Sequence, residues 1–221
     1  MKTFFVGMLS SLAAMLLSFL VVRWRWPALL SRVSGSQLFA HGVEFKYQDQ
    51  AAAERDMRHD FHSSSTVQVL CMRAFSVVQI DRPFSFLMEA GSTIDLRLLI
   101  ADPGDASGDN PFLVMRGKEY KGLDPADYRA DVYSSVKRIR EAMKANTRIT
   151  CRLHVLPACH RLYICDDRAY VSFFTPYLSG SQLPIVRVRR SSVLYEGMKR
   201  YFQQCWAMSR EISDLNFDST S

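Results

Sequence analysis

The stretch TIDLRLLIADP (residues 93–103) decides the fold class. Its apolar residues follow one another almost without interruption, and Asp102-Pro103 ends the run. A short run of this kind predicts a strand that is buried on both faces of a sheet. The segment TVQVLCMRAF (66–75), which is rich in valine and other apolar residues, predicts a second strand of the same kind. We therefore expect a sheet that is mostly buried.

Helices and strands alternate on either side of these two strands. The segment 126–146 has apolar residues at the spacing of one helix face, whereas 160–174 reads as a hairpin that turns at Asp166-Asp167. Shorter patterns complete the prediction: a short helix at 82–91, strands at 147–156 and 184–192, and a closing amphipathic helix at 192–212. This order predicts an α/β domain over residues 63–212, followed by a flexible tail at 213–221.

The N-terminal segment TFFVGMLSSLAAMLLSFLVV (residues 3–22) is a run of twenty residues without a charge. A helix of that length spans about 30 Å, the thickness of the hydrocarbon core of a bilayer. Trp24 and Trp26 follow it, and such rings are typical of the membrane interface. A cleaved signal peptide would have a shorter apolar run, of about 7–15 residues, and a small-residue cleavage site. We therefore expect an uncleaved transmembrane helix.

The cations beside this helix predict its orientation. Lys2 precedes it, whereas Arg23, Arg25 and Arg32 follow it. The positive-inside rule then predicts a single-pass protein of the inner (plasma) membrane with its C-terminal domain in the cytoplasm. We expect residues 23–62 to form a juxtamembrane linker and a stalk helix. Small residues in the membrane segment would allow helices to associate, so we also expect a homo-oligomer, although a lone helix tolerates the same residues.

The composition excludes several classes of protein. The 221 residues carry 28 Lys and Arg against 22 Asp and Glu, a net charge of +6, and 48% of them are hydrophobic. These values exclude a disordered chain and are compatible with anionic partners. Five cysteines without a CxxC pair favour a reducing compartment over a disulfide scaffold. The sequence has no G-x-S-x-G, G-x-G-x-x-G or P-loop motif, and we expect neither a metal nor a cofactor.

Three segments of the chain together resemble one known family. The strand IDLRLLIADP (94–103), the run from His160 to Asp167, and a final helix with Phe202 and Trp206 follow one another in this order. They are similar to the patterns V-x-V-R-x-L-x-D, H-x-K-x-x-x-x-D and F-x-x-x-W of the phospholipase D superfamily. The resemblance implies a mixed sheet flanked by helices. It also implies phosphodiester chemistry, with His160 as the nucleophile and Asp167 at the aspartate position.

This resemblance, which covers about residues 63–210, fails at positions that catalysis needs. Leu162 stands at the lysine position, and leucine neither carries charge nor donates a hydrogen bond to a phosphoryl oxygen. Ser-Phe-Phe-Thr at 172–175 replaces the G-S-x-N turn of the family. Because the chain has one motif, a working site would need a second copy to supply the second histidine. We therefore expect a catalytically degenerate domain.

Arginines on the predicted strands are the candidate ligand-binding residues. They are Arg152, Arg161, Arg187, Arg189 and Arg190. Guanidinium groups held on a sheet suit phosphate oxygens, so the expected ligand is anionic: a nucleotide, a nucleic acid or a lipid head group. Ordinary solvated strands with salt-bridged arginines explain the same pattern.

Three hypotheses about function stay open. The first is a membrane signalling or effector protein whose degenerate domain binds an anionic ligand or partner. The second is an active membrane-bound phosphodiesterase, a phospholipase or nuclease, that works as a dimer through His160. The third is a membrane assembly or scaffold factor. A purely structural interpretation of the motif also exists, in which His160 begins a strand and Asp166-Asp167 only form its turn.

Overall fold

The computed structural model describes residues 41–104, 110–119, 124–176 and 178–212. The transmembrane helix expected at 3–22 and the tail expected at 213–221 lie outside these residues. Within the described ranges, no helix is long and apolar enough to cross a membrane.

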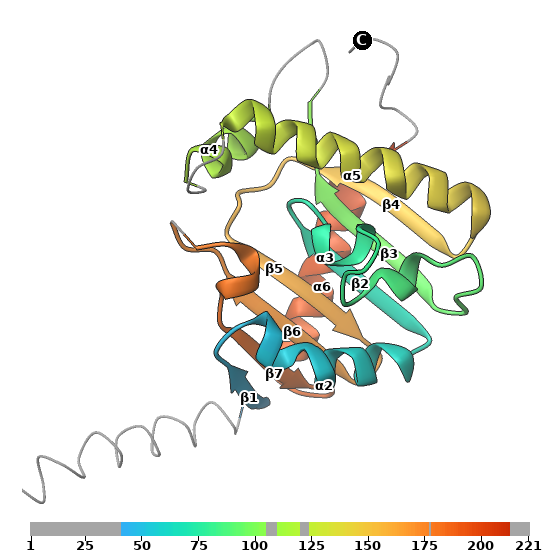
Figure 1. Cartoon of the computed structure of the whole chain (residues 1–221). Coiled ribbons are helices and arrows are strands. Elements are labelled where there is room, and N and C mark those ends of the chain that lie inside the picture. Colours follow the sequence, from blue (N-terminus) through green and yellow to red (C-terminus); the bar gives the residue numbers. More distant parts are fainter. Residues whose placement is uncertain (1–40, 105–109, 120–123, 177, 213–221) are drawn as a thin grey trace, which may run out of the picture. The chain divides into compact units, whose positions relative to one another are not determined.

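Eight strands form one mixed sheet in the order β1-β7-β6-β5-β2-β3-β4-β8 (Figure 1). The three neighbours β2, β3 and β4 run parallel, and every other neighbouring pair is antiparallel. The strands are β1 (Val43–Tyr47), β2 (Thr66–Cys71), β3 (Asp95–Ala101), β4 (Ile149–His154), β5 (His160–Cys165), β6 (Arg168–Phe173), β7 (Ile185–Arg189) and β8 (Arg210–Glu211). The expectation of an α/β fold with a mixed sheet is confirmed.

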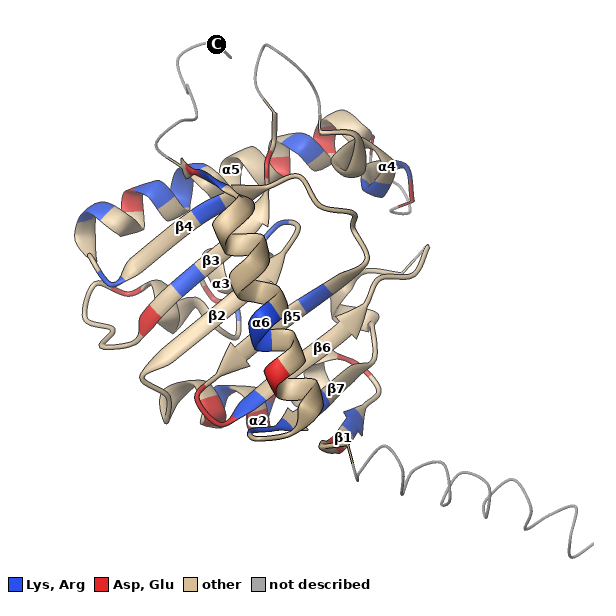
Figure 2. Cartoon of the chain, turned by 180° about the vertical axis from the view of Figure 1, so that it is seen from behind, with Lys and Arg blue, Asp and Glu red and all other residues tan. Residues whose placement is uncertain are grey.

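Helices cover both faces of this sheet. Figure 1 shows α2, α3 and α5 in front of it, and Figure 2 shows α6 on the opposite face. The helices are α2 (Gln50–His62), α3 (Phe75–Val78), α4 (Pro111–Glu119), α5 (Pro125–Ala145) and α6 (Val193–Met208), with 3-10 turns η1 (Ser85–Met88) and η2 (Gly180–Gln182). The core accordingly has two parts, one under α2 and α5 and one under α6.

The alternation of side chains along β5 decides what each of its residues faces. Leu162 and Ile164 belong to the apolar cluster under α6, whereas Tyr163 and Cys165 belong to the cluster under α2 and α5. Successive residues of a strand point to opposite faces. Arg161 therefore shares the face of Tyr163, and His160 shares the face of Leu162.

The folded unit begins earlier in the chain than the predicted boundary at residue 63. Residues 42–62 were expected in a linker and stalk, but the described residues from Gly42 onward belong to one unit. β1 pairs with β7, and α2 buries Met57 and Phe61 in the core. β1 is a short edge strand with two charged residues, and such a strand has no clear apolar alternation that would distinguish it from a linker.

Two predicted helices differ in extent. The segment 82–91 forms only the 3-10 turn η1. The closing helix ends at Met208, and Arg210–Glu211 pair with β4 instead of continuing the helix to 212. The Arg210 guanidinium meets the buried carboxylate of Asp102 at the end of β3, which holds this short strand at the sheet edge.

Candidate functional site

A large cavity lies where β2 ends and β5 begins. Its volume is about 880 Å³, within the range of small-molecule sites. The two strands are antiparallel, with Leu70 opposite Leu162, so the end of β2 at Cys71 and the start of β5 meet at one edge of the sheet. Ligands of α/β proteins usually bind outside the carboxyl ends of parallel strands, and β2 is one of the three parallel strands here.

Four arginines line this cavity, and each lies over an aromatic ring. The distances from guanidinium carbon to ring centroid are 4.8 Å for Arg73 and Tyr128, 4.7 Å for Arg82 and Phe75, 4.6 Å for Arg116 and Phe174, and 5.4 Å for Arg161 and Tyr163. A guanidinium that is stacked on a ring keeps its position and its five donors. The cavity thus has several cations whose positions are set before any ligand arrives.

Arg161 differs from the other cavity arginines in its partners. It is 8% exposed, and it donates to the side-chain oxygen of Gln50 and to the backbone oxygen of Gly180, both at 2.9 Å. Its Nε is buried without a hydrogen-bond partner, and no carboxylate of the described residues lies within 4 Å of it. Burying a cation without an opposite charge is unfavourable. An anion in the cavity would remove this penalty.

Two of the other cavity arginines already have carboxylate partners. Arg73 pairs with Asp131 at 2.7 Å, and Arg116 pairs with Glu119 at 3.3 Å while it donates to two backbone oxygens. Asp49, another lining residue, accepts from the backbone N–H of Ala52 as the N-cap of α2. These carboxylates therefore have partners of their own and do not compensate Arg161.

The thiol and the two phenols that line the cavity stay neutral at neutral pH, whereas Glu54 adds a carboxylate to the lining. Burial raises the pKa of the Cys71 thiol to about 11 and that of the Tyr128 phenol to about 12. Burial also raises the pKa of Tyr163, whose hydroxyl lies 2.8 Å from that of Ser76. No thiolate or phenolate therefore competes with a ligand for the guanidinium groups.

The structure places His160 and Asp167 at opposite ends of β5. His160 faces α6, where its ring lies 5.2 Å from Tyr201 and 6.3 Å from Phe173. Burial lowers the pKa of this imidazole. Asp167 lies in the exposed turn between β5 and β6 and accepts from Arg190 at 3.2 Å. The large cavity lined by Arg73, Arg82, Arg116 and Arg161 is called the arginine cavity below. His160 is not among its lining residues, and the cavity opens on the other face of the sheet.

Leu162, at the lysine position of the motif, is a core residue. It is 1% exposed and packs in the cluster under α6 with Leu70, Val171 and Phe202. A lysine ammonium at this depth would be desolvated and without a charged partner. The absence of lysine therefore agrees with the packing of this chain.

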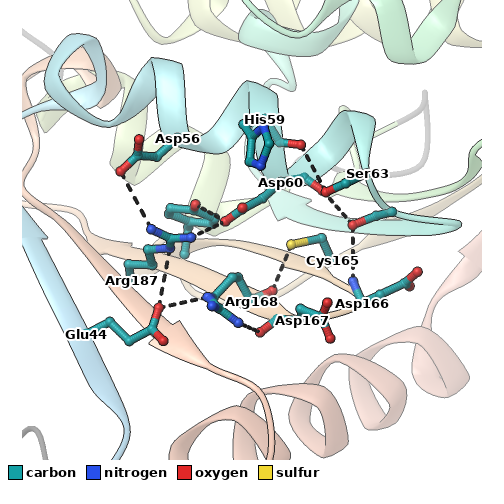
Figure 3. A network of polar contacts seen from close by, with 12 residues as sticks. Glu44, Asp56, His59, Asp60, Ser63, Cys165, Asp166, Asp167, Arg168 and Arg187 are labelled. Atoms are coloured by element: carbon teal, nitrogen blue, oxygen red, sulfur yellow. Dashed lines mark hydrogen bonds and ion pairs between the residues drawn. The ribbon is translucent and has the colours of Figure 1, made fainter.

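Arg187, the first of the predicted ligand-binding arginines on β7, is held by carboxylates (Figure 3). It lies 2.8 Å from Asp60, 3.6 Å from Asp56 and 3.5 Å from Glu44. Asp60 also accepts a short hydrogen bond from the hydroxyl of Tyr170. This network joins β1, α2, β6 and β7, and it leaves Arg187 in a structural role.

The other predicted arginines are dispersed. Arg152 donates to the backbone oxygen of Trp206, lies over the same indole ring and pairs with Glu211 at 3.2 Å. Arg189 is exposed at the end of β7, and Arg190 pairs with Asp167. Of the five candidates, only Arg161 lines the large cavity. The salt-bridged interpretation of the strand arginines therefore holds for Arg152, Arg187 and Arg190.

Sequence reasoning missed the other three arginines of the cavity, Arg73, Arg82 and Arg116. Arg73 alone had a usable signal, because it follows β2 almost at once and the carboxyl end of a parallel strand is a common place for ligand contacts. Arg82 and Arg116 come from a loop and from α4, and only the tertiary fold brings them to this edge.

Comparison with known proteins assigns no family. No family model matches the chain, and no curated protein matches it in sequence. The archaeal chromatin protein TrmBL2, whose structure shows a mode of DNA binding, aligns with 92% of this chain and 68% of its own at 10% identity and a TM-score of 0.46. The phospholipase D family member Nuc from Salmonella typhimurium aligns with 73% of this chain and 91% of its own at 12% identity and a TM-score of 0.46. Both TM-scores lie below 0.5.

Proposed function

We propose that this chain is a membrane-anchored protein whose phospholipase D-like domain binds an anionic ligand and does not catalyse phosphodiester cleavage. The observation that carries the binding proposal is Arg161, a buried cation that has no carboxylate partner among the described residues and lines a cavity of about 880 Å³. The apolar segment 3–22 and its flanking arginines support the membrane anchor and a cytoplasmic domain. The mixed sheet and the order of the three motif segments support the resemblance.

The ligand that fits these groups carries phosphate. Guanidinium groups bind phosphate oxygens in a two-pronged geometry, and several arginines around one cavity suit more than one phosphate. A nucleotide or a lipid head group has this chemistry. If the ligand binds one arrangement of a homo-oligomer more tightly than another, its binding would shift the population toward that arrangement and so change the state of the membrane segment.

Replacing Arg161 with glutamine should weaken the binding of ATP and of inorganic pyrophosphate by about tenfold or more, because a charge-assisted hydrogen bond contributes roughly 1.5–3 kcal/mol. Calorimetric titration of the full-length chain in detergent measures the effect. Arg148→Gln is the matched control: it removes the same charge from an exposed pair with Asp95 at the opposite end of the parallel strands. Equal affinity in both variants, or no binding by the wild type, would contradict the proposal.

The alternative, an active phosphodiesterase, predicts turnover of bis(p-nitrophenyl) phosphate that disappears in His160→Ala. We expect no turnover from the full-length chain. His160 lies on the face opposite the arginine cavity, and the neighbouring Leu162 supplies no charge to a phosphoryl group. Activity that depends on His160 would establish the enzyme and overturn the degenerate-site proposal. An inactive His160→Ala variant counts only if its circular dichroism matches that of the wild type.

A further inference from the structure

One wall of the arginine cavity carries a negative charge. Glu54 of α2 lines the cavity and is half-buried. Gln50, which accepts from Arg161 at 2.9 Å, lies four positions earlier on the same helix and lines the cavity as well. Helix residues four positions apart lie on the same face, one turn from each other. The Glu54 carboxylate therefore lies one helical turn from the contact that holds Arg161.

Arg82 lines the same cavity from a different element. It follows α3, which lies on the same face of the sheet as α2 (Figure 1), and its guanidinium carbon lies 4.7 Å from the ring centroid of Phe75. Within the described residues, neither Arg82 nor Glu54 forms an ion pair. Two opposite charges thus line one cavity without neutralising each other.

The other polar groups of the lining do not reach Glu54. Its remaining carboxylates bind Arg73 and the N-terminus of α2. Its serine hydroxyls have partners of their own: Ser76 lies 2.8 Å from the Tyr163 hydroxyl, and Ser179 lies 2.9 Å from both Ser181 and Gln182. No hydrogen bond joins the Glu54 carboxylate to another described residue. A ligand in the cavity therefore meets Glu54 as an acceptor and Arg82 as a donor.

The chemistry of these two groups selects among the possible parts of a ligand. An ammonium group would donate to Glu54, but it has no lone pair for Arg82 and carries the same charge as this arginine. A phosphate or carboxylate would accept from Arg82 but would be repelled by Glu54. A hydroxyl group donates and accepts at once. Of the three groups, the hydroxyl alone satisfies both side chains.

We infer that the arginine cavity binds a phosphate ester of a sugar or another polyol. Its hydroxyl groups lie between Glu54 and Arg82, and its phosphate lies toward Arg161. This inference rests on the proposed binding of phosphate and specifies the rest of the ligand. A volume of about 880 Å³ leaves room for a ring beside the phosphate groups. The ribose of a nucleotide and the inositol ring of a lipid head group share this chemistry.

Calorimetric titration of the full-length chain in detergent tests the inference with ATP, inositol trisphosphate and inorganic triphosphate, which has no hydroxyl-bearing ring. ATP or inositol trisphosphate should bind about tenfold or more tightly than triphosphate. The one that binds more tightly identifies the source of the ring. If it is ATP, dideoxy-ATP, which lacks both ribose hydroxyls, should bind about tenfold less tightly than ATP.

Glu54→Ala should weaken the binding of the preferred ester about tenfold, because it removes the acceptor of the hydroxyl groups. The same variant should leave triphosphate binding unchanged or make it tighter, since it removes a negative charge from the neighbourhood of a polyanion. Arg82→Gln should also lower the ratio of ester to triphosphate affinity. Glu196→Ala is the matched control, because it removes an exposed carboxylate from α6 on the opposite face of the sheet and should change neither affinity.

Three results would overturn this inference. They are equal affinity for triphosphate and both esters, a Glu54→Ala variant that weakens triphosphate as much as the ester, and binding of phosphoethanolamine as tight as that of the preferred ester. The second result would give Glu54 a structural role, and the third would replace the hydroxyl with an ammonium group. The absence of binding by all ligands would instead contradict the proposed function. If Glu54→Ala fails to fold, Arg82→Gln gives the decision, because Arg82 is exposed and has no ion pair within the described structure to lose.

Discussion

Replacing Phe61 with alanine should lower the free energy of unfolding by about 3–5 kcal/mol. Phe61 is 0% exposed, and its ring lies 5.1 Å from Phe84, 5.8 Å from Tyr163 and 6.2 Å from Tyr170. The truncation removes an aromatic side chain from the centre of this cluster and leaves a cavity that the neighbouring rings cannot close. It also weakens the packing of α2 on the sheet, because the Phe61 ring lies against Tyr163 of β5 and Tyr170 of β6.

Chemical denaturation followed by circular dichroism measures this effect. The matched control is Arg55→Ala, on the exposed side of the same helix, which should change stability by less than about 0.5 kcal/mol. A small effect of Phe61→Ala, comparable with that of the control, would mean that α2 is a separate stalk and not part of the domain. The experiment therefore also tests where the folded unit begins.

The sequence predicts the central strands because one requirement, burial in the apolar core, decides most of their residues. β2, β3, the β5–β6 hairpin and α5 are all visible as apolar runs, alternation or helical spacing. Burial on both faces leaves no polar position that would blur the pattern of β3. The Asp166-Asp167 turn is equally clear, because aspartate tolerates the backbone conformation of a tight hairpin.

The sequence does not identify β1 and α2 as parts of the domain, for a different reason. β1 has five residues, of which Glu44 and Lys46 are charged, as is usual for an edge strand. α2 does contain an apolar residue at every fourth position, at Ala53, Met57 and Phe61. That spacing predicts a packed helix. The spacing was a usable signal, but it does not reveal which surface the helix covers.

Residue type alone does not show which of the strand arginines lines the candidate site. An arginine on a strand gives no indication of what lies opposite it in the fold. Arg187 meets Asp60, which comes 127 positions earlier, and so becomes part of a structural network. Among the described residues, Arg161 donates to an amide oxygen and a backbone oxygen and forms no ion pair with a carboxylate. The difference depends on tertiary neighbours, which alternation along the strand does not encode.

Lowering the pH from 7 to about 4 should reduce the free energy of unfolding by about 3 kcal/mol through His154 alone. This imidazole is 3% exposed, and burial lowers its pKa to about 4. Its Nδ1 accepts from the backbone N–H of Leu156, so Nε2 carries the proton that is donated to the backbone oxygen of Cys71, both at 3.2 Å. Protonation of Nδ1 would place its N–H opposite the backbone N–H of Leu156, so that two buried donors would face each other without an acceptor.

The direction of this pH effect follows from the two pKa values of His154. The unfolded chain takes up a proton near pH 6.5, whereas the folded protein resists protonation until about pH 4. The contribution is therefore complete above pH 6.5 and is lost progressively as the pH falls to about 4. Denaturation curves at pH 7 and pH 4.5 should differ less in His154→Gln than in the wild type, since the amide does not titrate. An equal pH dependence in the two proteins would exclude His154 as the cause. Because His154 holds the carbonyl of Cys71, acid should weaken the edge of the arginine cavity first.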